Sequence, residues 1–187
     1  MEWKRFKRNT ERLWEDPEIC LDTYGYQIQA GTKWNPGLKY QEIQSFEQKL
    51  GFRLPWHYKD MLRHINGFDR ESINIQGKNS DFEPINISKP TEYATYRRNC
   101  YKYPDDLDNV GWLIEEISLN TESVKIALNH TSFNFDDILG YIPLYGHRAL
   151  VSFKNNKLSP IISVWGSDIV LYAKDINKYY NREFLWK

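Results

Sequence analysis

The sequence predicts an α+β fold in which helices pack on a mixed or antiparallel sheet. Apolar residues at helical spacing in the first third, short β-rich runs in the C-terminal half, and a capped helical segment at the end all favour this class. The 187 residues fit one domain with elaborations, and 41% of them are hydrophobic, which is enough for a sizeable core.

The apolar spacing from Leu38 onward predicts a helical hairpin. Gly51 ends the first helix as a C-cap, and Pro55 suits the first turn of the second. Asn66-Gly67 is expected to close the second helix, because both residues tolerate positive φ. The apolar faces of the two helices comprise Ile43, Phe46 and Leu50, then Tyr58, Met61, Leu62 and Ile65.

Short β-rich runs dominate the rest of the chain and predict an antiparallel sheet. Tight turns are expected at Lys154–Lys157 and at Gly166–Asp168. Asp175 is expected to cap a last helix, with Ile176, Tyr179 and Tyr180 toward the core. The predicted strands are Val124–Leu128, Tyr141–Leu144, Ala149–Phe153, Ile161–Trp165 and Ile169–Tyr172.

The domain organisation follows from these patterns. Residues 1–33 form an N-terminal extension, in which residues 2–14 predict an amphipathic helix that packs on the domain in preference to presenting its basic face. Residues 34–187 form a single domain with a variable, loop-rich insertion around 69–137. A short strand is possible at Ser72–Ile75.

Composition excludes several functional classes. Lys+Arg and Asp+Glu are both 25, so net charge gives no reason to expect direct binding to nucleic acid or an anionic membrane. No apolar run is long enough to span a bilayer, and the charged start MEWKRFKR does not resemble a secretory signal. Cys20 and Cys100 lack CxxC spacing, which indicates a reducing compartment. We therefore expect a cytoplasmic protein.

The histidines do not form a recognisable reaction centre. On one helix, His57 and His64 would share a face but lie about 10 Å apart, too far to bind one metal ion. His147 could act as a general base, but no nucleophile motif accompanies it. We expect His147 to be structural, with Arg148 paired to a carboxylate such as Asp168.

The acidic motifs fail similar tests. A calcium loop numbered from Asp106 lacks the ligands required at its fifth and twelfth positions. A nuclease centre built on Asp105, Glu122 and Lys125 would place the last two on opposite sides of a strand. We therefore predict no catalytic residues, no metal and no cofactor, while a hydrolase with a dispersed site stays possible as an alternative.

Acidic residues are concentrated between residues 105 and 137, where Lys125 is the only Lys or Arg. Such a surface would attract a basic partner and disfavour wrong ones. Alternatively, these acids are ordinary solvated residues or pair with the basic N-terminus. Trp56 lies off the apolar face of its helix, so it either closes a core edge or contributes to an interface. The predicted partner-binding residues are Trp56, Asp105, Asp106, Asp108, Glu115, Glu116, Asp136 and Asp137.

The order of several motifs resembles the SUKH superfamily, in particular its Smi/Knr type. The sequence is similar over roughly 34–68 and 138–184, whereas residues 1–33 and 69–137 have no counterpart. The matched positions are Glu47, Leu50, Gly51, Leu54, Pro55, Tyr58, Asn66 and Gly67, then Pro143, Gly146, Arg148, Ser163, Gly166, Asp168, Ile169, Tyr179, Glu183 and Phe184.

The resemblance implies an α+β platform that binds other proteins without catalysis. Bacterial members resemble immunity proteins that neutralise a cognate toxin, often a nuclease, and fungal relatives regulate cell-wall synthesis and signalling. We therefore expect a bacterial immunity protein whose partner is a cognate protein toxin. The alternative is a regulatory scaffold in cell-wall synthesis or stress signalling. The sequence leaves the oligomeric state open.

Overall fold

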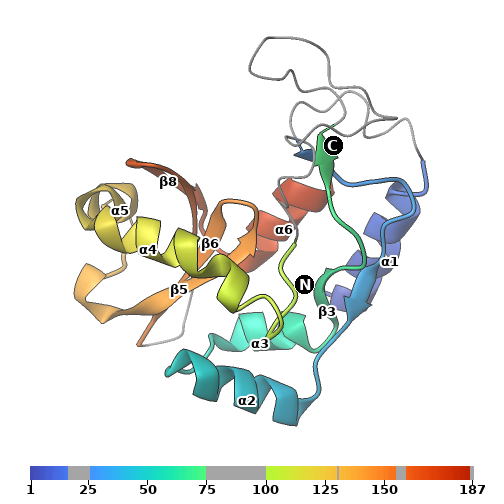
Figure 1. Cartoon of the computed structure of the whole chain (residues 1–187), viewed down its shortest axis with the longest axis horizontal. Helices are drawn as coiled ribbons and strands as arrows, with labels where there is room; N and C mark the ends of the chain where they lie inside the picture. Colours follow the sequence, from blue (N-terminus) through green and yellow to red (C-terminus); the bar gives the residue numbers. More distant parts are fainter. Residues whose placement is uncertain (17–25, 75–99, 130, 155–158, 186–187) are drawn as a thin grey trace.

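The computed structural model describes residues 1–16, 26–74, 100–129, 131–154 and 159–185. Figure 1 shows α4 and α5 at one end of the long axis and α1 at the other. The helices are α1 (Trp3–Leu13), α2 (Tyr40–Leu50), α3 (Trp56–Leu62), α4 (Gly111–Leu119), α5 (Thr121–Leu128) and α6 (Ile176–Phe184), with 3₁₀ turns η1 (Asp108–Val110) and η2 (Phe135–Asp137). The strands are β1 (Tyr26–Gln27), β2 (Trp34–Pro36), β3 (Ile65–Phe68), β4 (Ile73–Asn74), β5 (Ile138–Tyr145), β6 (Arg148–Phe153), β7 (Ile161–Trp165) and β8 (Asp168–Ala173).

The C-terminal strands form an antiparallel sheet in the order β5-β6-β7-β8. This confirms the α+β class and four of the five predicted strands. Gly166, with φ +57°, lies in the tight turn between β7 and β8, where the sequence predicted one. The other predicted turn, Lys154–Lys157, lies largely outside the described residues.

Most of the sheet is covered on both faces, and alternate side chains of each strand point to opposite sides. Ala149 and Val151 of β6 pack toward α4 and α5, whereas Leu150 between them joins the larger cluster on the other face. That larger cluster includes side chains of α1, α2, α3 and α6. The sheet therefore separates a helical layer, α4 and α5, from the rest of the molecule.

The predicted strand at Val124–Leu128 is wrong, because this segment belongs to helix α5. Val124 and Leu128, one turn apart, are buried against the sheet, while Lys125 and Ile126 are exposed. Five residues of alternating polarity are compatible with a strand and with a helix. In the structure they are helical, and the helix packs against β8. Residues 111–119 and 121–128 of the predicted loop-rich insertion are thus helical.

The helical hairpin is confirmed as α2 and α3, with Gly51 in the left-handed conformation at the end of α2. Glu47 links the two helices: its Oε1 accepts a hydrogen bond from Leu54 N at 2.7 Å and lies 3.1 Å from Lys59 Nζ. The predicted end of the second helix is wrong. Helix α3 stops at Leu62, and Ile65–Phe68 forms strand β3, paired with β2.

Asn66 and Gly67 connect β3 to the segment that leads into α4. The Asn66 side chain donates to Tyr103 O at 2.6 Å and accepts from Tyr103 N at 2.9 Å. Gly67 has φ +71°, and a Cβ atom there would lie 2.6 Å from Cys100 O. The Asn-Gly pair therefore holds two distant chain segments together.

Helix α1 is confirmed and lies against α6. Trp3 and Phe6 are buried, with ring centroids 5.3 and 5.7 Å from that of Tyr180. The predicted C-terminal helix is confirmed as α6, where Asp175 Oδ1 accepts from Lys178 N at 2.9 Å as an N-cap. Strand β4 falls within the predicted Ser72–Ile75 strand and pairs with β1.

Candidate functional site

The acidic residues predicted to bind a partner are distributed along the α4–α5 layer. Asp105, Asp106 and Asp108 precede or begin η1, and Glu115 and Glu116 lie on α4. The remaining two, Asp136 and Asp137, form part of η2 between α5 and β5. The structure thus places seven of the eight predicted residues in one helical layer and its two flanking turns.

These carboxylates differ in how far they are neutralised. Asp105 pairs with Lys102 at 2.7 Å, and Asp137 pairs with Lys154 at 3.6 Å. Asp106 stabilises the turn before α4 by accepting hydrogen bonds from Lys102 N and Asn109 Nδ2. Among the seven acids, those that form no ion pair with a Lys, Arg or His side chain of the described residues are Asp106, Asp108, Glu115, Glu116 and Asp136.

Glu122 and Lys125 do not face opposite sides, as a strand would require. They lie three residues apart on α5, and their side chains form an ion pair at 2.6 Å. This pair is largely exposed to solvent, so it contributes little to stability. The sequence argument that Glu122 and Lys125 face opposite sides of a strand is therefore wrong, because both residues lie on a helix.

Large apolar side chains are exposed on the same layer, and the sequence analysis did not identify them. Trp112 is 52% exposed, Leu119 78% and Ile126 71%. A helical projection of 111–119 and 121–128 would have found them, because their positions oppose the buried Leu113, Ile117, Val124 and Leu128. We define the α4–α5 surface as Asp108, Trp112, Glu115, Glu116, Leu119, Glu122 and Ile126.

A shallow groove borders the α4–α5 surface, with a volume of about 510 Å³. The end of α2, one side of α4 and strand β5 line it, including Leu50, Phe52, Ile114 and Leu139. Lys49 is the one charged side chain in this lining. Protein interfaces commonly combine an apolar centre with a polar rim, which this arrangement provides.

Trp56 is exposed at the first turn of α3, with 59% of its surface accessible. Trp56 is therefore not one of the buried core residues. Its ring centroid lies 3.9 Å from that of His57. No hydrogen bond or ion pair described for the chain joins Trp56 to the acidic residues, so its part in a common surface stays a prediction.

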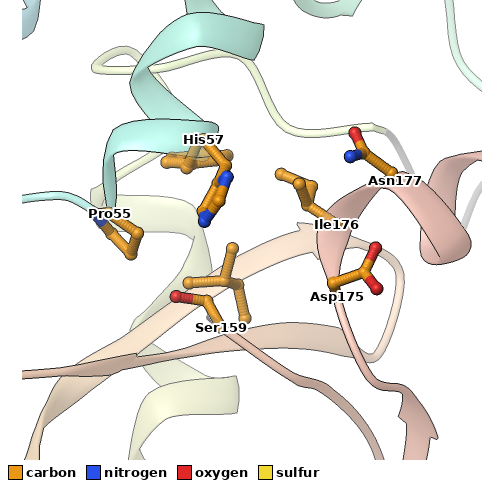
Figure 2. Close-up of a pocket in the computed structure, with 8 residues that line it drawn as sticks. Pro55, His57, Ser159, Asp175, Ile176 and Asn177 are labelled. Carbon is orange, nitrogen blue, oxygen red and sulfur yellow. The ribbon is translucent and has the colours of Figure 1, made fainter. Parts of the chain in front are cut away.

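A second cavity of about 150 Å³ contains His57, Ser159 and Asp175, the side-chain types of a hydrolase triad. Figure 2 shows the Asp175 carboxylate turned away from His57. That carboxylate accepts a hydrogen bond from Lys178 N as the cap of α6, and the buried Ser159 Oγ has no hydrogen-bond partner among the described residues, so Ser159 and His57 are not joined as nucleophile and base. The cavity therefore does not present the relay that a triad requires.

His64 lies beyond the end of α3, where its Nδ1 contacts Asp60 O at 2.8 Å. His57 and His64 therefore do not share a helix face, contrary to the sequence prediction.

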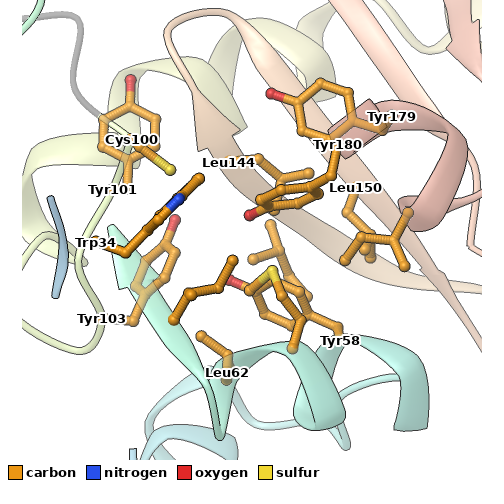
Figure 3. Packing of buried hydrophobic residues seen from close by; sticks show 14 of the residues in the cluster. Trp34, Tyr58, Leu62, Cys100, Tyr101, Tyr103, Leu144, Leu150, Tyr179 and Tyr180 are labelled. Carbon is orange, nitrogen blue, oxygen red and sulfur yellow. The ribbon is translucent and has the colours of Figure 1, made fainter. Parts of the chain in front are cut away.

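The buried core contains a thiol and several tyrosines, shown in Figure 3. Burial raises the pKa of the Cys100 thiol, and burial likewise raises the pKa of Tyr58, Tyr103 and Tyr180. A buried thiol held protonated is a poor nucleophile, because the thiolate is the reactive form. Cys100 therefore belongs to the core packing.

Arg148 does not pair with Asp168, contrary to the sequence expectation. Its Nη1 donates to Ser163 Oγ at 2.8 Å and also contacts His147 Nε2, and its guanidinium carbon lies 4.0 Å from the centre of the Tyr172 ring. Arg182 approaches the same ring at 4.2 Å, and Tyr172 donates to Glu183 Oε2 at 2.7 Å. We call His147, Arg148, Ser163, Tyr172, Arg182 and Glu183 the Arg148 cluster.

The described residues contain no group of three or more His, Cys, Asp or Glu side chains arranged to hold a metal ion. Their helices also include none with the length and apolar character needed to cross a bilayer.

The fold and its surfaces define an α+β protein with an exposed acidic and apolar helical layer. Residues 37–184 match the SMI1/KNR4 family (SUKH-1), so the chain belongs to that family. The match includes the α4–α5 layer, for which the sequence motifs had no counterpart. Among curated proteins, no match to the chain was found.

Proposed function

We propose that this protein is a bacterial immunity protein that binds a cognate toxin in the cytoplasm and neutralises it stoichiometrically, without catalysis. The observation that carries the proposal is the α4–α5 surface, where unpaired carboxylates surround exposed apolar side chains. Membership of the SMI1/KNR4 family supports a protein-binding role. A toxin such as a nuclease suits this surface, because nucleases need basic residues to bind their own substrate.

The charges of the α4–α5 surface would mainly increase the rate at which the toxin associates with this protein. Asp108, Glu115 and Glu116 have no cationic partner among the described residues, so their field extends into solvent. Complementary charge of this kind raises association rates and disfavours wrong partners. The occupied toxin surface could then no longer bind its substrate.

The exposed apolar side chains of the α4–α5 surface would supply most of the binding free energy. Trp112 is more than half exposed on α4, and aromatic side chains dominate the energetics of interface centres. Leu119 and Ile126 extend this apolar area along α4 and α5. The adjacent groove offers space for a side chain of the toxin.

The first test is whether a binding partner of this protein is toxic. A partner recovered from the native organism is expressed alone and together with this protein. We expect growth arrest with the partner alone and recovery once this protein reaches equimolar amounts. Several unrelated, non-toxic partners would instead support the regulatory scaffold and contradict the immunity role.

The second test locates the toxin on the α4–α5 surface. Trp112→Ala is expected to weaken toxin binding by about tenfold to a hundredfold, since aromatic hot spots contribute about 2 kcal/mol or more. Glu115→Lys is expected to slow association and reduce its dependence on salt. Tyr40→Ala and Glu2→Lys change residues that are also exposed but lie outside this surface, and they serve as controls. Equal losses in test and control variants would contradict this location.

A further inference from the structure

The Arg148 cluster lies on a part of the sheet that the helices leave uncovered. Arg148, Ser163 and Val170 are paired in register across β6, β7 and β8, so their side chains share one face. Trp165, two residues after Ser163, belongs to the same face. Trp165 is 65% exposed and Val170 48%, while Leu150 and Ile161 further along this face are buried.

The two guanidinium groups of the cluster have no counter-ion within the described chain. Arg148 and Arg182 both lie against Tyr172, and neither has a carboxylate oxygen within 4.0 Å. The nearby Glu183 accepts its hydrogen bond from the Tyr172 hydroxyl. The cluster therefore carries two arginine charges against one carboxylate.

Arg148 also keeps an unused hydrogen-bond donor. Its Nε is shielded from solvent and has no hydrogen-bond partner, although its Nη1 is engaged by Ser163 and His147. A buried donor without an acceptor costs about 1–3 kcal/mol. An acceptor group that reached the guanidinium edge would recover part of that cost.

We propose that the Arg148 cluster binds an acidic side chain presented by a peptide segment of a partner protein, next to an apolar residue. A carboxylate matches the planar edge of a guanidinium, with which it forms paired, charge-assisted hydrogen bonds. Trp165 and Val170 offer contact area for the apolar neighbour. Nucleic acid fits less well, because it requires several cations along its backbone.

This site is separate from the α4–α5 surface and does not depend on the immunity role. Ala149, Val151, Ile162 and Val164 lie on the other face of the same strands and pack against α4 and α5. The sheet therefore lies between the two surfaces. A partner could occupy the Arg148 cluster while a basic toxin occupied the α4–α5 surface.

The test uses the full chain labelled with ¹⁵N and follows the Nε–H signals of its arginines by NMR. The probes are acetyl-Leu-Glu-Leu-amide, its Gln analogue and inorganic phosphate. We expect the Glu peptide to shift the signals of Arg148 and Arg182 at millimolar concentrations, as a single ion pair with flanking contacts allows. The Gln peptide should bind at least about tenfold more weakly.

Variants separate recognition from folding. Arg182→Gln alters an exposed residue and should weaken binding of the Glu peptide severalfold. Arg148→Lys keeps the charge but loses the planar edge, and should weaken it about tenfold. Arg5→Gln, an exposed arginine on α1, is the control and should leave binding unchanged. Thermal unfolding of each variant shows whether the cluster has stayed folded.

Three results would overturn the proposal. One is equal binding of the Glu and Gln peptides, and another is the absence of any shift in the two arginine signals up to about 10 mM peptide. The third is phosphate binding as tight as that of the Glu peptide, which would define a general anion site in place of peptide recognition.

Discussion

Replacement of Gly67 by alanine should destabilise the protein far more than the same change at Gly51. Both glycines have positive φ, +71° and +76°, so both alanines suffer the same backbone strain of about 1–2 kcal/mol. At Gly51 nothing lies within 4 Å of the added Cβ. At Gly67 the Cβ would lie 2.6 Å from Cys100 O and 2.9 Å from Lys102 N, two backbone atoms that cannot rotate away.

The additional loss of stability in Gly67→Ala comes from hydrogen bonds that must lengthen to make room for the Cβ atom. Moving residues 100–103 away from β3 stretches the hydrogen bond from Phe68 N to Cys100 O and the two that join Asn66 to Tyr103. Buried hydrogen bonds of this kind contribute about 1 kcal/mol each. We therefore expect Gly67→Ala to cost about 3–5 kcal/mol and Gly51→Ala about 1–2 kcal/mol.

Urea denaturation followed by tryptophan fluorescence measures both free energies of unfolding. A difference below about 1 kcal/mol between the variants would refute the close approach of β3 and residues 100–102. Asn66→Ala provides a second measure, since it leaves two buried backbone groups of Tyr103 unpaired and should cost about 2–4 kcal/mol.

Three further predictions concern titratable and capping groups. Burial raises the pKa of the four fully buried tyrosines, Tyr58, Tyr103, Tyr179 and Tyr180, so these contribute stability below pH 10 that is lost above it at about 5 kcal/mol per pH unit, measured by urea denaturation from pH 8 to 11. A stability that stayed flat over this range would contradict their burial. In a Cys20→Ser variant, Cys100 should react with a thiol reagent only as fast as the protein unfolds; rapid reaction of the native variant would show that Cys100 is accessible. Asp175→Ala should cost about 1 kcal/mol through loss of the α6 cap, and Asp175→Asn much less, by thermal unfolding; equal losses would contradict the capping role.

Much of the fold could be predicted because local chemistry and tertiary structure agree. Gly51 and Asp175 act at helix ends as the sequence indicated, and the C-terminal strands lie where β-rich runs predicted them. The errors occur where local chemistry permits two outcomes. Asn66-Gly67 can end a helix, but Asn66 instead pairs with Tyr103, which lies 37 residues further along the chain.

The two surfaces proposed to bind partners were less predictable, because both depend on the arrangement of elements in space. The acids between residues 105 and 137 were visible in the sequence, but the exposed apolar residues among them emerge only once the segment is helical. The Arg148 cluster combines a turn, three strands and α6. The sequence suggested a carboxylate partner for Arg148, whereas the structure places it against Tyr172.

The two cores of the molecule explain how the α4–α5 surface could vary without loss of the fold. Leu113, Ile117, Val124 and Leu128 anchor α4 and α5 to one face of the sheet, and the larger cluster lies on the other face. Trp112, Leu119 and Ile126 point away from both cores. Changes at these three positions should therefore alter the free energy of unfolding by about 0.5 kcal/mol or less, as is usual for surface sites. Large losses of partner binding at unchanged stability would then identify them as contact residues, whereas a matching loss of stability would show that they support the fold.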